Sequence, residues 1–224
     1  MDTDGKFNEV SSWTSGSNAT GVAVITDTVR LIVAPDEWYT YDGDNDGAWN
    51  GNKRSAWGGY NRTVTGIKTT DSSSEAITDF AGSSNTDQII SQLKGTTDSY
   101  SSHYTGAPAA EYCQAYSKGC KGVGEWYLPS VGEMNVLVTN KSTINTALSK
   151  ISGETLGSVP FTWTSTQYSS RTAWGYYWSN EDFDGYSYKA SVGFGLFALS
   201  KNWYNQFFFK GGANVPPIFF LIFK

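Results

Sequence analysis

Three acidic side chains that are close together in the chain are the first candidates for catalysis. Glu181, Asp182 and Asp184 lie among aromatic residues, which could stack against a sugar ring. Glycosidases use two carboxylates, one as the acid and the other as the base or nucleophile. Carboxylates this near in sequence are more often simply solvated. We therefore expect the chain not to be an enzyme, and keep a carbohydrate-active enzyme as the alternative.

A second acidic cluster, DGDNDG at 42–47, begins like a calcium-binding loop. Asp42, Asp44 and Asp46 could offer carboxylates to Ca²⁺. An EF-hand also needs Glu at its twelfth position, and this chain has Lys53 there. A solvated turn rich in Asp and Gly is the simpler interpretation, so we expect no cofactor and keep calcium as an alternative.

Other catalytic signatures are missing from the sequence. His103 is the only histidine, and no G-x-S-x-G nucleophile elbow accompanies it. No G-x-x-x-x-G-K-[ST] phosphate loop is present. The spacing of Cys113 and Cys120 matches no zinc or redox motif, so these residues either form a disulfide or remain buried thiols.

The segment 174–188, WGYYWSNEDFDGYSY, has the composition of a binding surface. Seven of its fifteen residues are aromatic, and the others are Gly, Ser, Asn and acids. Tyr and Trp give rigid contact area while Ser, Gly and Asn give adaptable hydrogen bonds, as in antibody binding loops. The polar residues interrupt any regular period, so we expect an exposed face, with packing in the core as the alternative.

Composition narrows the function classes further. The chain has 224 residues, 16% aromatic and 17% charged, with a net charge of −5. This profile fits a loop-rich extracellular domain, and the acidic balance argues against a nucleic acid partner. The sequence begins with no signal peptide, and the apolar stretch 218–223 is too short to span a membrane. We expect a location outside the cell or on a virion surface, as a phage protein or a fragment of an exported chain.

The pattern of elements predicts an α+β fold with two or three helices between strands. Residues 1–20 are expected to be a lead-in or linker, and 21–224 a single domain. A hairpin is predicted at 21–34, and β-rich chain follows residue 161. Helices are predicted within 71–94, where Thr86 or Asp87 could be the N-cap, and at 107–119, from Ser130, and at 141–151.

Two motifs carry a family resemblance. The run GEWYLPSVGEM (124–134) contains the capping-box spacing of Ser130 and Glu133. It is preceded by PAAEYC (108–113) and followed by WTST (163–166). This order resembles a bacterial and phage family with a C-type-lectin-like fold, whose members show W-[RY]-L-P-[ST]-x-x-E-[LM] and later W-T-S-[ST].

The resemblance implies that the terminal strands pair and that long C-terminal loops form a ligand face, here about 163–210. Some members resemble variable proteins of diversity-generating retroelements, in which adenine-directed mutagenesis rewrites chosen codons. Trp174, Trp178, Gly185 and Lys189 would be the fixed frame of such a face. The predicted ligand-binding residues are Arg171, Thr172, Gly175, Tyr177, Ser179, Asn180, Asp182, Phe183, Tyr186, Tyr188, Ser191, Trp203, Tyr204 and Asn205.

The sequence thus predicts a non-catalytic receptor-binding or adhesin domain. Its diversifiable face would contact a protein or a glycan on a cell surface. A structural subunit of a fibre or pilus is a further alternative, because IFFLIF at 218–223 needs a partner strand and could pair with a neighbouring chain. We expect the N-terminal hairpin to cover it. The closing strand of the fold is either 192–199 or 215–223.

Overall fold

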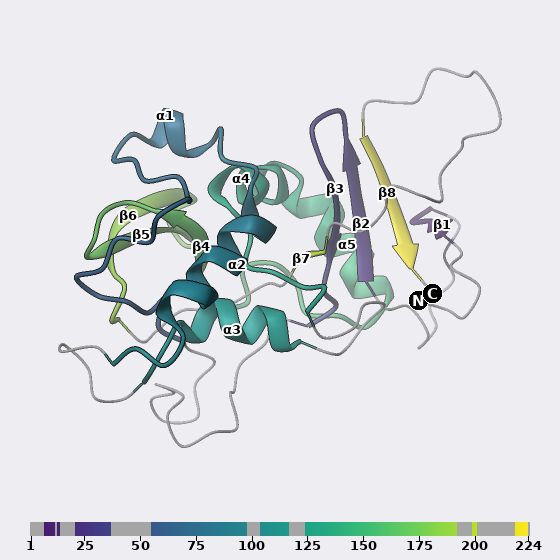
Figure 1. The fold of residues 1–224 in the computed structure, drawn as a ribbon. Helices are drawn as coiled ribbons and strands as arrows, with labels where there is room; N and C mark the ends of the chain where they lie inside the picture. The colour runs from purple at the N-terminus through teal and green to yellow at the C-terminus, as the bar shows by residue number, and fades with distance from the viewer. Residues whose placement is uncertain are drawn as a thin grey trace.

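The structure is a computed structural model that describes residues 7–11, 13, 21–36, 55–97, 104–116, 124–191, 199–200 and 218–223. Helices and antiparallel sheets are both present, so the predicted α+β class is confirmed (Figure 1). Within the described part of the chain, none of the helices has the length and hydropathy needed to cross a bilayer.

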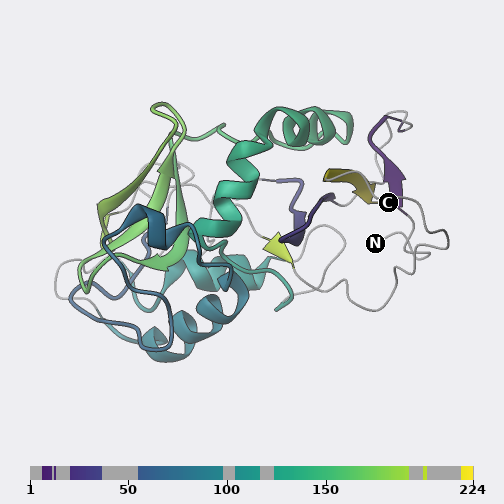
Figure 2. The same ribbon diagram turned by 90° about the horizontal axis from the view of Figure 1, so that it is seen from above.

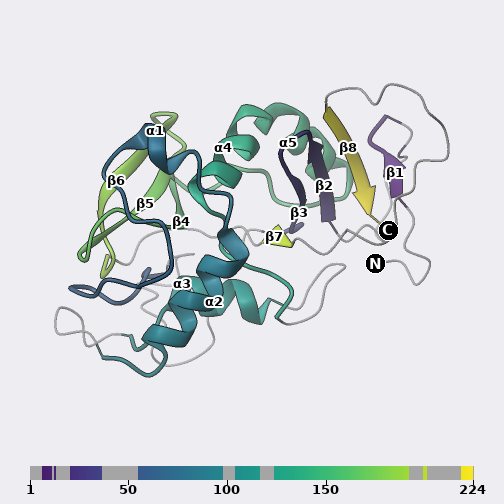
Figure 3. The same cartoon turned by 45° about the horizontal axis from the view of Figure 1, so that its top comes forward.

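The described strands form two separate sheets, with α4 and α5 between them in the views of Figures 2 and 3. The elements, in chain order, are β1 (Phe7–Glu9), β2 (Gly21–Thr26), β3 (Arg30–Val33), α1 (Ser73–Ala76), α2 (Gly82–Leu93), α3 (Pro108–Ala115), α4 (Val131–Thr139), α5 (Lys141–Lys150), β4 (Phe161–Gln167), β5 (Thr172–Tyr177), β6 (Asp182–Tyr188), β7 (Leu199–Ser200) and β8 (Ile218–Phe223).

The first sheet joins the two ends of the chain in the order β1-β8-β2-β3-β7. β8 pairs antiparallel with β1 and with the full length of β2, so the N-terminal hairpin covers 218–223 as expected. β2 is apolar on both faces because both faces are covered. Val22 and Val24 pack in one core cluster while Ala23 packs in the other.

The expected lead-in, 1–20, contributes to this sheet. It contains β1, and Trp13 is buried in the core cluster that also holds Val22. Of the two candidate closing stretches, the one at the chain end forms β8. In the other, Leu199 begins β7, and 192–198 lies outside the described residues.

The start of α4 explains the WYLPSVGEM motif. The predicted capping box between Ser130 and Glu133 is present, and both residues are buried. One carboxylate oxygen of Glu133 accepts the Ser130 N–H at 3.0 Å, and the other accepts the Tyr127 hydroxyl at 3.3 Å. A Cβ at Gly82 would lie 2.1 Å from this carboxylate, so α2 must begin with glycine to pack here.

The predicted cap of α2 was wrong. The helix begins at Gly82, with Ala81 as its N-cap, and Thr86 is a buried residue inside it. The Thr86 hydroxyl donates to the Gly82 carbonyl at 2.8 Å and accepts the Leu128 N–H at 3.0 Å. It therefore joins α2 to the WYLP segment, a long-range contact that the local sequence does not show.

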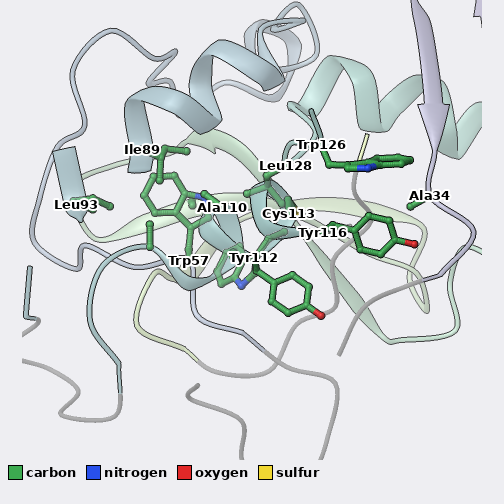
Figure 4. Close-up of a cluster of buried hydrophobic side chains, with 14 of the residues drawn as sticks. Ala34, Trp57, Ile89, Leu93, Ala110, Tyr112, Cys113, Tyr116, Trp126 and Leu128 are labelled. Carbon is green, nitrogen blue, oxygen red and sulfur yellow. The ribbon is translucent and has the colours of Figure 1, made fainter. Parts of the chain in front are cut away.

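One core cluster joins α2 and α3 to residues of both sheets. Figure 4 shows Ile89 from α2 and Cys113 from α3 beside Trp57 and Leu128. Cys113 is a free, buried thiol, and burial raises its pKa. Cys120 lies outside the described residues. In the structure Cys113 is therefore part of the hydrophobic core.

Candidate functional site

The β5–β6 hairpin sorts the aromatic residues of 174–188 into buried and exposed groups. Trp174 and Trp178 are buried, and their indole N–H groups donate to the Thr70 carbonyl and the Thr162 hydroxyl. Tyr186 and Tyr188 are exposed, by 74% and 48%. The two tryptophans are thus scaffold, as predicted, and the outer strand carries the accessible rings.

The two exposed tyrosines lie on the same side of β6 because successive side chains of a strand point to opposite faces. Tyr186 and Tyr188 face solvent, whereas Gly185 and Ser187 are buried. A Cβ at Gly185 would lie 1.9 Å from the Tyr168 ring, so this position has to be glycine for Tyr168 to pack there. The alternation therefore gives the strand an outer side made of rings.

Two further tyrosines extend this row. The Tyr168 and Tyr186 ring centroids are 5.2 Å apart, and those of Tyr60 and Tyr188 are 5.9 Å apart. We call Tyr60, Tyr168, Tyr186 and Tyr188 the tyrosine face. A side-chain hydrogen bond with Tyr186, with burial and nearby charges including Asp184, raises the pKa of Tyr168 to about 12. The Tyr168 hydroxyl is therefore tied to its neighbour Tyr186 within the face.

The candidate catalytic acids are bonded to their own strand. Asp182 accepts the Phe183 N–H at 2.8 Å. Asp184 accepts the Tyr186 N–H at 3.2 Å and the Ser187 hydroxyl at 2.7 Å. Glu181 is exposed and has a φ of 53° in the hairpin turn. These contacts give the two aspartates a structural role, because they satisfy backbone N–H groups of the outer strand.

Lys189 directly follows this strand in the chain and is fully buried. Its ammonium donates to Gln167 Oε1 at 2.6 Å and to the Arg62 carbonyl at 2.9 Å, and it lies 4.4 Å from the Trp57 ring centroid. Burial lowers the pKa of Lys189 to about 7. The side chain thus fastens the loop that carries Tyr60 to the second sheet.

The predicted contact residues do not all reach the surface. Thr172 and Gly175 are buried because β5 is the central strand of its sheet, and a Cβ at Gly175 would lie 2.1 Å from the Phe161 ring. The exposed members are Arg171, Ser179, Asn180, Asp182, Tyr186 and Tyr188, and the half-buried ones are Tyr177, Phe183 and Ser191. Trp203, Tyr204 and Asn205 lie outside the described residues.

The sequence analysis did not name two members of the face, Tyr60 and Tyr168, or the adjoining Asn61 as contact residues. Asn61 accepts a hydrogen bond from Arg171 Nε at 2.9 Å. Tyr60 and Asn61 belong to a turn far from the aromatic segment in sequence, so only the fold brings them there. The one local signal is the Gly58-Gly59 pair before them, which marks a tight turn.

No metal centre is formed by the described residues, among which no three His, Cys, Asp or Glu side chains gather. The candidate calcium ligands Asp42, Asp44 and Asp46 are outside the part of the chain that the structure describes. The calcium alternative therefore stays a prediction.

No protein-family model matches the chain, and no curated protein matches it. Among solved structures, it is similar to a fimbrial protein from Bacteroides ovatus ATCC 8483, with a TM-score of 0.45 and 16% sequence identity. The match covers 76% of this chain and 35% of that chain, so this chain corresponds to about a third of its length. A TM-score of this size is too low to assign a shared fold.

Proposed function

We propose that this chain is a non-catalytic ligand-binding domain of C-type-lectin-like fold, which presents the tyrosine face to a protein or glycan outside the cell or on a virion. The observation that carries the proposal is the exposure of Tyr186 and Tyr188, at 74% and 48%, on an ordered strand. Tyrosine combines a large ring with a polar tip and is enriched where proteins bind their partners.

Rigidity of the face supports the same function. Gly185 and Ser187 pack on the buried side of β6. The side chains of Asp182 and Asp184 accept hydrogen bonds from backbone N–H groups of the same strand. A preorganised surface loses less entropy on binding than a flexible loop. The aspartates are thus used in building the face, which favours a binding domain over a glycosidase.

The proposed fold is supported by the placement of its motif residues. Buried Glu133 caps α4 from within the WYLPSVGEM run, and buried Trp163 donates to the Ser55 carbonyl at 2.9 Å. A fibre subunit remains the alternative function. β8 has β1 on one side and β2 on the other, so the pairing needed by 218–223 is supplied within the chain.

The proposal includes retroelement diversification, and limits it to the exposed positions. Ser179, Asn180, Tyr186 and Tyr188 can change without disturbing the core, whereas Thr172 and Gly175 are inside the sheet. The gene neighbourhood tests this. A template copy near a reverse transcriptase gene should differ at adenines in the codons of the exposed residues, and a neighbourhood without one contradicts diversification.

The binding function is tested by removing the two exposed rings together. Binding of the purified protein to arrays of glycans and extracellular proteins should fall about tenfold or more in Tyr186→Ala/Tyr188→Ala, because these rings supply the contact area. Asp27→Ala/Arg30→Ala is the control, since both residues are exposed at the β2–β3 hairpin. Unchanged binding by the tyrosine variant would show that the face is not the site. Product analysis of the same glycans should find no turnover.

A further inference from the structure

One end of the tyrosine face is a composite corner built from distant parts of the chain. Tyr60 meets Tyr188 with an interplanar angle of 66°, and Asn61 accepts from Arg171. Rings, an amide and a guanidinium therefore adjoin within one small area. We call Tyr60, Asn61, Arg171 and Tyr188 the arginine corner.

Two hydrogen bonds with Lys189 fix the turn that brings Tyr60 and Asn61 to this corner. The Gly58 N–H donates to the Lys189 carbonyl at 3.0 Å, and the Lys189 ammonium donates to the Arg62 carbonyl. Gly58, Gly59 and Asn61 all have positive φ, which fixes a tight turn. The corner is consequently preorganised before any ligand arrives.

Arg171 gives the corner a positive charge and further guanidinium N–H donors besides the one that bonds to Asn61. Its Nε donates to Asn61, and among the described residues it has no carboxylate partner. The side chain is exposed in a chain whose net charge is −5. The charges of Asp71 and Asp184 act on Tyr168, which lies in the same β4–β5 turn as Arg171. The exposed guanidinium can bind a ligand carboxylate through two parallel hydrogen bonds.

Among the described residues the corner has no exposed aliphatic side chain, which favours a sugar over a protein partner. Exposed large hydrophobic residues among those described are Ile77, Phe80, Tyr186 and Tyr188, and only Tyr188 belongs to the corner. Protein interfaces centre on an apolar, desolvated core. A sugar instead needs a ring to pack against and polar groups for its hydroxyls, which Tyr188 and Asn61 offer.

Resting on the proposed binding function, we infer that the arginine corner is a subsite for a carboxylate-bearing sugar, a uronic or sialic acid unit of a glycan. The Arg171 guanidinium holds the carboxylate. The Tyr188 ring packs against the sugar, and the Asn61 side-chain amide binds its hydroxyl groups. Lys189 is a positioning residue, since it acts through the turn and touches no ligand.

An array of matched probes tests the inference. It carries glycans ending in uronic or sialic acid, the same glycans with neutral ends, and glutamate-rich peptides. Wild-type protein should bind the acidic glycans over the neutral ones. Arg171→Gln should lose about tenfold or more of that binding, and Arg171→Lys should recover part of it. Arg30→Gln is the matched control, because it removes an exposed arginine from β3.

Each other outcome overturns the inference. Equal binding to acidic and neutral glycans, or full binding by Arg171→Gln, excludes the carboxylate contact. Preference for the glutamate-rich peptides replaces the glycan with a protein partner. If no acidic glycan binds while binding elsewhere on the arrays still depends on Tyr186 and Tyr188, the subsite is wrong and the proposed function stands.

Discussion

At the scale of single residues, Lys189 is a lysine whose side chain is removed from water. It is fully buried, its ammonium bonds to neutral oxygens of Gln167 and Arg62, and it lies over Trp57. Burial disfavours the charged form of a lysine and lowers its pKa, here from 10.5 to about 7. The folded protein therefore releases this proton at a lower pH than the unfolded chain does.

The consequence is a pH-dependent stability with a definite sign. Above pH 7 the unfolded chain still holds the lysine proton that the folded protein has lost, so the free energy of unfolding should rise with pH up to about 10.5. The slope from this group is at most about 1.4 kcal/mol per pH unit. Below pH 7 both states are protonated and the contribution is flat.

Urea unfolding across this pH range checks the prediction. Lys189→Met keeps an apolar chain over Trp57 and removes the titrating group, so the difference between wild type and variant isolates Lys189 from the tyrosines that titrate at high pH. The difference should grow with pH in favour of the wild type. Parallel pH profiles would show that the lysine titrates as it does in solution.

At the scale of elements, hydrogen bonds fix the start of α4 to the segment that precedes α2. Glu133 is buried, caps α4, and accepts from Tyr127, while Ser130 donates to the Asp79 carbonyl at 2.7 Å. Removing the carboxylate takes the acceptor away from two buried donors, the Ser130 N–H and the Tyr127 hydroxyl, and each loss costs free energy.

Glu133→Ala should therefore lower the free energy of unfolding by about 3 kcal/mol. Glu75→Ala in α1 is the matched control, because Glu75 is exposed and should cost less than about 1 kcal/mol. Chemical denaturation measures both. A Glu133 variant as stable as the Glu75 variant would mean that the buried capping box contributes little.

At the scale of the whole molecule, β8 joins segments from the two ends of the sequence. It lies between β1 and β2, and its pairing with β2 runs from Gly21↔Phe223 to Thr26↔Ile218. Such long-range pairing supplies backbone partners that no local segment can replace.

A chain that ends at Pro217 should lose cooperative folding, because β1 and β2 would face solvent with unpaired edges. Size-exclusion chromatography and thermal melting should show aggregation and loss of a sharp transition. A chain that ends at Phe223 keeps β8 and should behave as wild type. A truncated protein that remained monomeric with an unchanged melting temperature would contradict the role of β8.

The sequence by itself determined the local elements. The apolar runs within 21–34 predicted the β2–β3 hairpin, and Ser130 with Glu133 predicted the start of α4. These signals are readable because each depends on residues a few positions apart. The composition of 174–188 predicted an exposed face, and two of its seven rings, Tyr186 and Tyr188, are exposed, while Trp174, Tyr176 and Trp178 are buried.

Tertiary structure alone decided which rings those are and what surrounds them. Gly175 is buried because Phe161 packs on it, and Gly185 because Tyr168 does. Tyr60 joins the face because Lys189 ties its turn to the second sheet. Such contacts depend on how sheets and loops pack at long range, which no local pattern of residue types encodes.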